Sequence, residues 1–327
     1  MKKYLGLLFL IVLMNGCDDG DVTVEAINFD DVTASSCGNI LYKLKENQAL
    51  FVKIPDSYDA FKNEITPVGT PDIILIGGEV EVRYRTYNGN VTRDNICPDI
   101  IQPIFPIAVA EWNAIAGFIE IATTPIYSAP NVTTGATKLV KYNHNIVFKP
   151  ITFNKPVGQQ RYDEFTFGDF TTDARPLDLA FLPENIALCP SSTTLYNVAN
   201  SRIEAMFIQN LDPALLSTTN LNVPKSRLIS STTNKLSYRL FETALPLGTN
   251  ADYFCAPTLP ASPTITEEWL AENGVNNVSG IIEVTTTTNG PTSVKHTIRL
   301  KGVTFRKGTS TFYYGNDILW GELITAN

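Results

Sequence analysis

Apolar and polar residues alternate along much of this 327-residue chain. In residues 80–84 every second side chain is apolar, and residues 236–240 repeat the pattern. A period of two with polar residues between is typical of a half-buried antiparallel strand. Aromatic and β-branched residues are plentiful, 20 Pro interrupt the chain, and helix signals are scarce. The pattern therefore predicts an all-β protein.

The alternating segments belong to a pattern that occurs twice, with an offset that stays between 152 and 163 residues. The matching positions are Cys37 and Cys189, Tyr84-Arg85 and Tyr238-Arg239, Cys97 and Cys255, Glu111-Trp112 and Glu268-Trp269, and Gly117 and Gly280. A period this long corresponds to a whole domain, whereas solenoid repeats have about 20–50 residues. Each copy is long enough to bury a core of its own.

A short helix is predicted after the second Cys of each copy. In the first copy it covers residues 107–116 and ends at Gly117. In the second copy, Thr264 to Glu267 forms a capping-box pattern, and Gly274 suits the position after a helix. Many short strands with turns between them predict two tandem antiparallel β-sandwich domains, loosely immunoglobulin-like. The Cys…Trp…Cys order of a true immunoglobulin domain is absent, because each Trp follows the second Cys.

The first residues resemble a lipoprotein export signal. Lys2 and Lys3 precede an uncharged, mostly apolar run of 11 residues, 4–14, which is too short to span a bilayer. Residues 13–17 read Leu-Met-Asn-Gly-Cys and resemble a bacterial lipobox, although Met and Asn are off-consensus. The resemblance implies cleavage before Cys17 and its modification with palmitate or similar acyl chains, of which two or more anchor a protein stably. The alternative is an ordinary signal peptide with a stray Cys.

Acidic residues follow directly, in the run Asp18-Asp19-Gly20-Asp21. This run resembles the surface-export signal of Bacteroidetes lipoproteins, and it also suits a solvated tether. Together with the repeat, it resembles flavobacterial (Bacteroidetes) surface lipoproteins with a duplicated β-domain. The resemblance implies lipid anchoring in the outer membrane at the cell surface, and it implies no activity. The predicted organisation is a signal peptide at 1–16, an acidic tether at 17–25, and β-sandwich repeats at 26–173 and 174–327.

The net charge argues against some partners. The full chain carries a formal charge of −8. Loss of Lys2 and Lys3 with the signal peptide would make the mature chain about −10. A protein this acidic is a poor partner for nucleic acid or for anionic lipid.

The five Cys are explained by one anchor and two disulfides. With Cys17 assigned to lipid, the remaining four allow three connectivities. Each copy holds two, so the repeat selects the pairs Cys37–Cys97 and Cys189–Cys255. A zinc site is the competing interpretation, and it is weak because no CxxC spacing occurs.

His144 and His296 occupy matching positions at the start of an apolar strand face. A duplicated inward His is typical of a structural histidine at a strand end. The functional alternative is that each His binds a metal ion, or acts as a base beside Glu111 or Glu268. One His per domain leaves too few ligands for zinc. The sequence therefore predicts no catalytic residue, no metal site and no cofactor, and it contains none of the common hydrolase or nucleotide-binding motifs.

Several aromatic residues are candidates for sugar contact. The Glu-Trp pairs could form a carbohydrate platform or supply an acid, whereas the structural alternative is that Trp112 and Trp269 anchor the helix. In the same way, the Tyr-Arg pairs are expected to place Tyr inward and Arg outward. The candidate ligand contacts are Tyr87, Tyr162, Tyr313 and Tyr314.

The leading functional hypothesis is a non-enzymatic cell-envelope lipoprotein with a binding or structural role, whose partner is a glycan or an envelope protein. The first alternative is glycan capture beside an outer-membrane importer, as in tandem-domain starch-binding lipoproteins. The second is a hydrolase, which the sequence favours least. The copies differ mainly in their loops, so ligand contact is expected in 88–96 or 242–254, and in 129–137 or 285–291.

Overall fold

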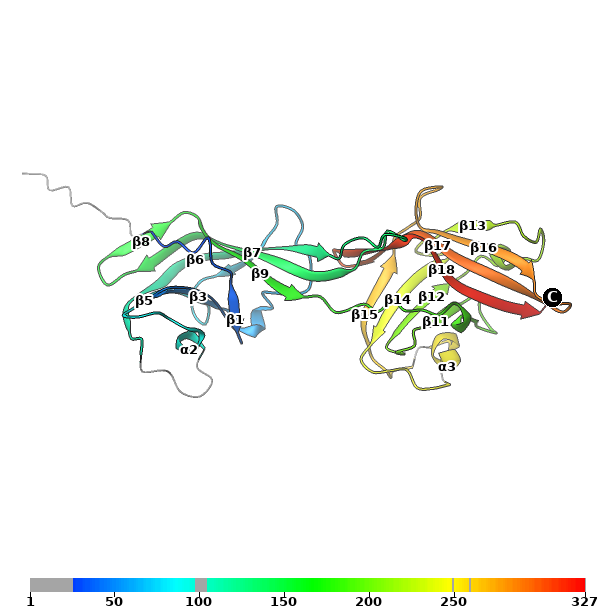
Figure 1. Ribbon diagram of the computed structural model, residues 1–327, viewed down its shortest axis with the longest axis horizontal. Coiled ribbons are helices and arrows are strands. Elements are labelled where there is room, and N and C mark those ends of the chain that lie inside the picture. The colour runs from blue at the N-terminus through cyan, green and yellow to red at the C-terminus, as the bar shows by residue number, and fades with distance from the viewer. Residues whose placement is uncertain (1–25, 98–104, 249, 259, 327) are drawn as a thin grey trace, which may run out of the picture. The chain divides into compact units, whose positions relative to one another are not determined.

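The computed structural model describes residues 26–97, 105–248, 250–258 and 260–326 (Figure 1). The predicted signal peptide, Cys17 and the acidic tether lie outside these residues. Strands dominate the described part and form two antiparallel nine-stranded sheets, one for each copy of the repeat. The predicted all-β class with two tandem β-sandwich domains is confirmed.

The first sheet contains β1 to β9. Its strand order is β1-β2-β3-β5-β6-β7-β8, with β4 paired to β6 and β9 paired to β7. A 3-10 turn, η1 (Asp56–Tyr58), follows β3. The strands are β1 (Ser35–Cys37), β2 (Ile40–Lys45), β3 (Gln48–Lys53), β4 (Asp72–Leu75), β5 (Glu81–Tyr87), β6 (Ala108–Tyr127), β7 (Leu139–Asn154), β8 (Gln159–Tyr162) and β9 (Phe165–Asp173).

The second sheet contains β10 to β18 in the order β10-β11-β12-β14-β15-β17-β16-β13, with β18 paired to β17. The 3-10 turns η2 (Pro183–Asn185) and η3 (Pro213–Leu216) precede β10 and β13. The strands are β10 (Ala187–Leu188), β11 (Leu195–Val198), β12 (Glu204–Gln209), β13 (Lys225–Leu228), β14 (Lys235–Phe241), β15 (Ile265–Ala271), β16 (Ile281–Thr288), β17 (Ser293–Lys307) and β18 (Ser310–Ala326).

Each sheet has a point at which a long strand changes partner. The first part of β6 pairs with β5 and its second part with β4; Gly117 lies between with φ 140°. A Cβ atom on Gly117 would lie 2.2 Å from the carbonyl oxygen of Pro150, so only glycine fits there. Similarly, β17 pairs first with β16 and then with β15, on either side of Gly302 (φ 60°). Such a change lets one hydrogen-bonded sheet supply both layers of a sandwich.

By packing, the chain divides into two units whose limits differ from those of the repeat. Unit 1 holds the described residues within Met1–Lys53, Ile76–Gly117 and Lys149–Phe165, and unit 2 holds those within Ile54–Leu75, Phe118–Phe148 and Thr166–Asn327. The division falls within β6, β7 and β9. The domain limits predicted from the repeat, 26–173 and 174–327, stay a prediction.

The main core of unit 2 contains residues from both copies. Leu139 and Tyr142 of β7 pack with Trp269, Phe312 and other apolar side chains of the second copy. The Tyr142 hydroxyl lies 3.3 Å from Oγ of Ser310. Second-copy side chains therefore cover the first part of β7.

The segment that joins the copies receives hydrogen bonds from a first-copy residue and donates hydrogen bonds to a second-copy residue, all within unit 2. Nζ of Lys138 donates hydrogen bonds to the carbonyl oxygens of Leu177 (2.8 Å) and Asp178 (3.1 Å). The backbone N–H groups of Asp178 and Leu179 donate to the two carboxylate oxygens of Glu204, each at 2.9 Å. Glu204 is only 1% exposed. Because a buried carboxylate is costly without such donors, these bonds fix the joining segment on β12.

A second, smaller apolar cluster lies under the disulfide of each copy. As a result β14 is buried on both faces: Ser237 and Arg239, at polar positions of a strand predicted to be half-buried, are 0% and 9% exposed. That prediction was wrong for β14, because the chain covers its second face. The first-copy cluster includes Tyr42, Phe51, Tyr87, Ile96 and Cys97, and the second-copy cluster includes Cys189, Phe207, Phe241, Tyr253 and Phe254.

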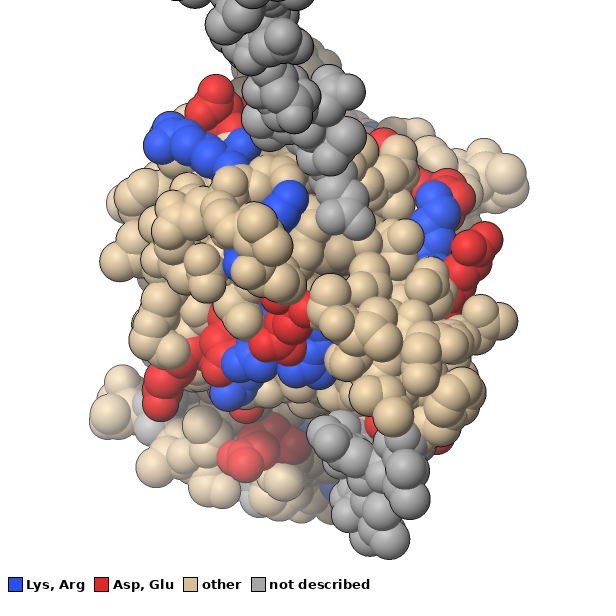
Figure 2. Space-filling view, turned by 90° about the vertical axis from the view of Figure 1, so that its left-hand side faces the viewer, with Lys and Arg blue, Asp and Glu red and all other residues tan. Residues whose placement is uncertain are grey.

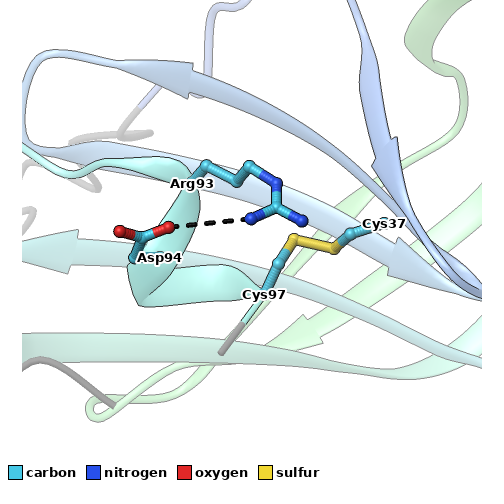
Figure 3. The surroundings of a disulfide bond; sticks show 4 residues. All are labelled: Cys37, Arg93, Asp94 and Cys97. Atoms are coloured by element: carbon cyan, nitrogen blue, oxygen red, sulfur yellow. Dashed lines mark ion pairs between the residues drawn. A yellow bond between two sulfur atoms is a disulfide. The ribbon is translucent and has the colours of Figure 1, made fainter. Parts of the chain in front are cut away.

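Both predicted disulfides, Cys37–Cys97 and Cys189–Cys255, are present. A short helix lies next to the second Cys of each: α2 (Arg93–Ile96) ends just before Cys97, and α3 (Asn250–Cys255) ends on Cys255. Figure 3 shows α2 beside the first disulfide, with Arg93 and Asp94 forming an ion pair at 3.7 Å. Each copy therefore has one short helix and one disulfide, as predicted.

The predicted positions of the helices, however, were wrong. Residues 107–116 lie mostly in β6, and residues 264–274 include β15. Trp112 and Trp269 are buried in these strands, opposite Tyr84 and Tyr238 on the neighbouring strands. The true N-cap of the first helix is Thr92, whose backbone N–H donates to Oδ1 of Asn95 at 2.9 Å.

Removal of each disulfide would show how much the cross-link contributes to the stability of the fold. They span 60 and 66 residues of sequence separation. Loops of this length give a stabilisation of about 4 kcal/mol in the chain-entropy model. We expect Cys37→Ser/Cys97→Ser and Cys189→Ser/Cys255→Ser each to lower the free energy of unfolding by about 2–4 kcal/mol in urea titrations. A loss below about 1 kcal/mol in both variants would contradict this expectation.

Candidate functional site

The Tyr-Arg and Glu-Trp pairs of the first copy are neighbours on adjacent strands. Tyr84 of β5 lies opposite Trp112 of β6, and Arg85 lies opposite Glu111. The rings of Tyr84 and Trp112 meet edge to face with centroids 5.0 Å apart, and both side chains are buried. On the other face of the sheet, Nε of Arg85 donates to the Glu111 carboxylate. The two sequence motifs are therefore one structural feature.

The second copy reproduces this feature. Tyr238 of β14 lies opposite Trp269 of β15, and Arg239 lies opposite Glu268. Nε of Arg239 donates to the Glu268 carboxylate at 2.7 Å. Trp269 also donates its Nε1–H to Glu267 at 2.9 Å. The same four residue types thus meet in the same register in both copies.

Each Arg of this feature lies on an aromatic ring. The guanidinium carbon of Arg85 is 4.9 Å from the centroid of Phe51, and that of Arg239 is 4.5 Å from Phe207. Both rings belong to the small clusters under the disulfides. The expectation that Tyr points inward holds, whereas the Arg side chains pack under a second cover and are not freely solvated. A cation over an aromatic face stabilises by about 0.5–2 kcal/mol.

The indole rings are likewise engaged within the fold. Nζ of Lys155 lies 4.5 Å from the ring of Trp112, and Nζ of Lys307 lies 4.9 Å from Trp269. Both Trp side chains are at most 3% exposed. In this conformation neither ring offers a face on which a sugar could stack.

Glu111 lies between two cations. Arg85 hydrogen-bonds it, and Nη1 of Arg83 lies 3.5 Å away. Burial raises the pKa of Glu111, but hydrogen bonds from Arg85 and Asn113 and the two positive charges outweigh burial and lower its pKa below the usual value. Because a general acid must carry a proton at the working pH, this ionised carboxylate is unsuited to that role near neutrality.

His144 is completely buried between two threonine hydroxyls. Its Nδ1 lies 2.9 Å from Oγ1 of Thr123, and its Nε2 lies 2.9 Å from Oγ1 of Thr172. The ring of Phe61 packs edge-on at 5.3 Å. Burial lowers the pKa of His144 to about 4, so the imidazole is neutral at physiological pH.

His296 has the same surroundings. Its Nδ1 and Nε2 each lie 2.9 Å from a threonine hydroxyl, of Thr286 and Thr325 respectively. Burial, and then the positive charge of Lys225, lower its pKa. Both ring nitrogens of both His are therefore occupied by structural hydrogen bonds. Within the described residues, His, Cys, Asp and Glu side chains form no group of three or more that could hold a metal ion.

Two of the four tyrosines predicted to contact a ligand are buried. Tyr87 is 4% exposed and packs in the cluster under the first disulfide. Tyr314 is 6% exposed, packs against Phe305, and has a pKa raised by burial. Their burial counts against a role in sugar stacking.

The other two tyrosines are partly exposed and already in contact with neighbours. The ring of Tyr162 packs against Phe153 and Phe165, with centroids 6.2 and 5.4 Å away. The hydroxyl of Tyr313 donates to Oδ1 of Asn316 at 2.7 Å. Tyr87 and Tyr162 belong to unit 1, whereas Tyr313 and Tyr314 belong to unit 2.

The loop at 129–137, where ligand contact was expected, is occupied within unit 2. The backbone N–H of Thr137 donates to the carbonyl oxygen of Tyr313 at 2.9 Å, and that of Asn316 donates to Thr134 at 2.7 Å. A Cβ atom on Gly135 would lie 2.9 Å from the side chain of Asn316. This loop therefore ties the first copy to β18.

Polar side chains line two of the surface pockets in the described part of the chain. The larger, about 510 Å³, lies in unit 1 and is lined by Glu81, Arg83, Glu111 and Asn113, among others. Its charged groups are paired with one another, Arg83 with both Glu81 and Glu111. Figure 2 shows one face of the molecule, on which most of the Lys and Arg side chains in view lie next to Asp or Glu. Paired charges attract an ionic ligand less strongly than unpaired charges do.

The second pocket, about 350 Å³, lies in unit 2 between β13, β16, β17 and the loop after β15. Sequence reasoning missed both pockets. The second had a signal in the sequence, because the offset between the copies rises within the segment that forms this loop.

Comparison of the chain with known protein families, with curated proteins and with solved structures finds no match. No helix in the described part of the chain is both long enough and apolar enough to span a bilayer. Functional inference therefore depends on the residues themselves.

The buried histidines predict a pH dependence of stability. The folded-state pKa of His144, about 4, is below the value of about 6.5 expected in the unfolded chain. The unfolded state therefore binds more protons between these pH values, and stability is full above about pH 6.5 and falls on acidification. Between pH 6.5 and pH 4, the wild type should lose up to about 3 kcal/mol of its free energy of unfolding because of His144. We expect His144→Gln to lack this loss when urea unfolding is measured at each pH. The hypothesis fails if the variant and the wild type show the same pH slope.

The pair formed by the nearly buried Arg239 and Glu268 predicts a stronger coupling than a pair in which both side chains are more exposed. Arg239 and Glu268 have side-chain exposures of 11% and 39%, whereas the control pair Arg299 and Asp317 has 36% and 44%. A double-mutant cycle with Arg239→Met and Glu268→Gln should give a coupling energy of about 1–2 kcal/mol. The same cycle on Arg299 and Asp317 should give less than about 1 kcal/mol. Equal coupling in the two cycles would show that burial adds nothing to the pair.

Proposed function

We propose that this chain is a lipid-anchored protein of the bacterial cell envelope, whose two β-sandwich domains serve binding or structure without catalysis. The supporting observation is the use of the duplicated polar residues. His144 and His296 are each held by two threonine hydroxyls, and Arg85 and Arg239 each pair with a Glu across the strands. The groups present in both copies with acid–base chemistry therefore stabilise the fold.

The anchor belongs to the same proposal. Its support is the resemblance of residues 13–17 to a lipobox and the acidic run that follows Cys17. Two or more acyl chains on Cys17 would hold the domains at a membrane without a spanning helix. The acidic run favours the outer face of the outer membrane.

Glycan capture beside an importer is the second candidate function. The burial of Tyr87, Tyr314, Trp112 and Trp269 removes these four rings as platforms for a sugar, and only Tyr162 and Tyr313 of the proposed aromatic contacts are partly exposed. What favours it now is the 350 Å³ pocket in unit 2, which is lined by hydrogen-bonding side chains. Small-molecule sites combine apolar walls with a few polar groups in this way.

Replacement of Cys17 tests the anchor. In cells expressing the full chain and fed an alkyne analogue of palmitate, we expect the wild type to carry the label, to sediment with outer membranes and to be accessible to protease on intact cells. Cys17→Ser should lose the label and the sedimentation. Cys189→Ser/Cys255→Ser, which removes two other cysteines, should keep the label. A Cys17→Ser variant that is still labelled, or an unlabelled wild type, would refute the proposal.

A further inference from the structure

The loop after β15 distinguishes the second copy from the first. Trp269 lies 157 residues after Trp112, whereas Gly280 lies 163 residues after Gly117, so the second copy has six additional residues between these positions. In the first copy the corresponding strand, β6, is unbroken. In the second copy β15 ends, a loop covers residues 272–280, and β16 begins.

This loop is fixed by hydrogen bonds and by close backbone packing. The N–H of Gly274 donates to Ile229, the N–H of Ile229 donates to Gly280, and the N–H of Gly280 donates to Gly302, at 2.8–2.9 Å. Val275 and Ser279 form an antiparallel bridge. A Cβ atom on Gly274 would lie 2.3 Å from the carbonyl oxygen of Gly280, so the two glycines allow an approach that other residues would block. The residues at the loop tip are therefore held in place.

The loop tip carries two amides without partners. The side chains of Asn276 and Asn277 are exposed, line the 350 Å³ pocket, and make no hydrogen bond to a residue that the structure describes. Each amide offers two donor hydrogens and an acceptor oxygen. Opposite them, β13 and β16 contribute Ser226 and Glu283, whose side chains lie 3.5 Å apart. The pocket thus has donors and acceptors on more than one side.

Arg227, Glu283 and Lys301 line this pocket, and each pairs with an opposite charge, Arg227 with Asp212 outside the lining. Nζ of Lys301 lies 2.7 Å from the Glu283 carboxylate, and Nε of Arg227 lies 2.5 Å from Asp212. A phosphate or carboxylate would meet no unpaired cation here, and a cation would meet no unpaired carboxylate. The electrostatics therefore favour an uncharged ligand.

The pocket also has an apolar part. Leu228, which is 37% exposed, and the partly buried Ile281 lie opposite each other on β13 and β16. A ligand that fits this pocket has several hydroxyl groups, which both donate and accept, and a C–H surface for the aliphatic side chains. The volume is at the lower end of the range for small-molecule sites, about 300–1,000 Å³.

We propose that this pocket of the second copy binds a neutral sugar residue, with Asn276 and Asn277 as the recognising side chains. The proposal rests on the binding role proposed above and names the ligand class and the site. The first copy lacks the six-residue insertion, so the two copies differ in binding.

The test uses saturation-transfer difference NMR on the full-length chain in detergent with single neutral sugars: glucose, galactose, mannose, xylose and N-acetylglucosamine. We expect at least one sugar to show saturable transfer to the wild type. Asn276→Ala/Asn277→Gly should weaken its affinity by about tenfold or more, because a lost pair of hydrogen bonds costs about 1.4 kcal/mol or more. Gly is chosen at 277 because this residue has φ 58°.

The matched control is Asn220→Gly, which makes the same change at φ 58° outside this pocket and should leave the affinity unchanged. Ser226→Ala, a smaller change inside the pocket, should weaken binding by about threefold or more. Thermal unfolding checks that the variants remain folded. The site is refuted if no sugar of the panel binds, or if the Asn variants bind as the wild type does. Because Cys17 labelling is measured separately, such a result leaves the anchoring proposal intact.

Discussion

The register between two strands in each copy is the constraint on which the rest of the sandwich depends. It places Tyr opposite Trp on the core face and Arg opposite Glu on the other face. A slip by one residue would exchange the faces and bury the charges in the main core. The pairing thereby fixes which side of the sheet receives the large core and which receives the small cluster under the disulfide.

Patterns that occur in both copies of the sequence gave correct predictions, whereas a pattern judged from a few consecutive residues gave a wrong one. The duplicated Cys predicted both disulfides, and the alternation of residues 80–84 predicted the buried face of β5. The Thr264–Glu267 pattern indicated a helix because a capping box is recognised from four consecutive residues. The segment forms a strand instead, because Trp269 is buried opposite Tyr238, a residue far away in the sequence. The true helices have four and six residues, too few for a helical period to be visible.

The candidate site shows the same limit. Sequence reasoning selected aromatic residues, and the fold uses most of them as core, because large rings are the most effective filling for a sandwich interior. The pocket residues Asn276 and Asn277 look like ordinary turn residues in the sequence. Their position became informative only when the paired glycines beneath them showed that the turn is held rigidly. The positions that are the same in both copies are therefore the structural ones. The insertion that only the second copy has marks the proposed binding site.

The shared core of unit 2 also bears on how this chain could evolve. A duplicated domain usually begins as two interchangeable parts. Here Leu139 and Tyr142 of the first copy pack in the core of the second, and Glu204 of the second copy holds the joining segment. Deletion of the first copy would expose apolar side chains of the second to water and remove the hydrogen bonds from Lys138 to the joining segment. The second copy therefore depends on the first for part of its core, and the two copies are no longer interchangeable.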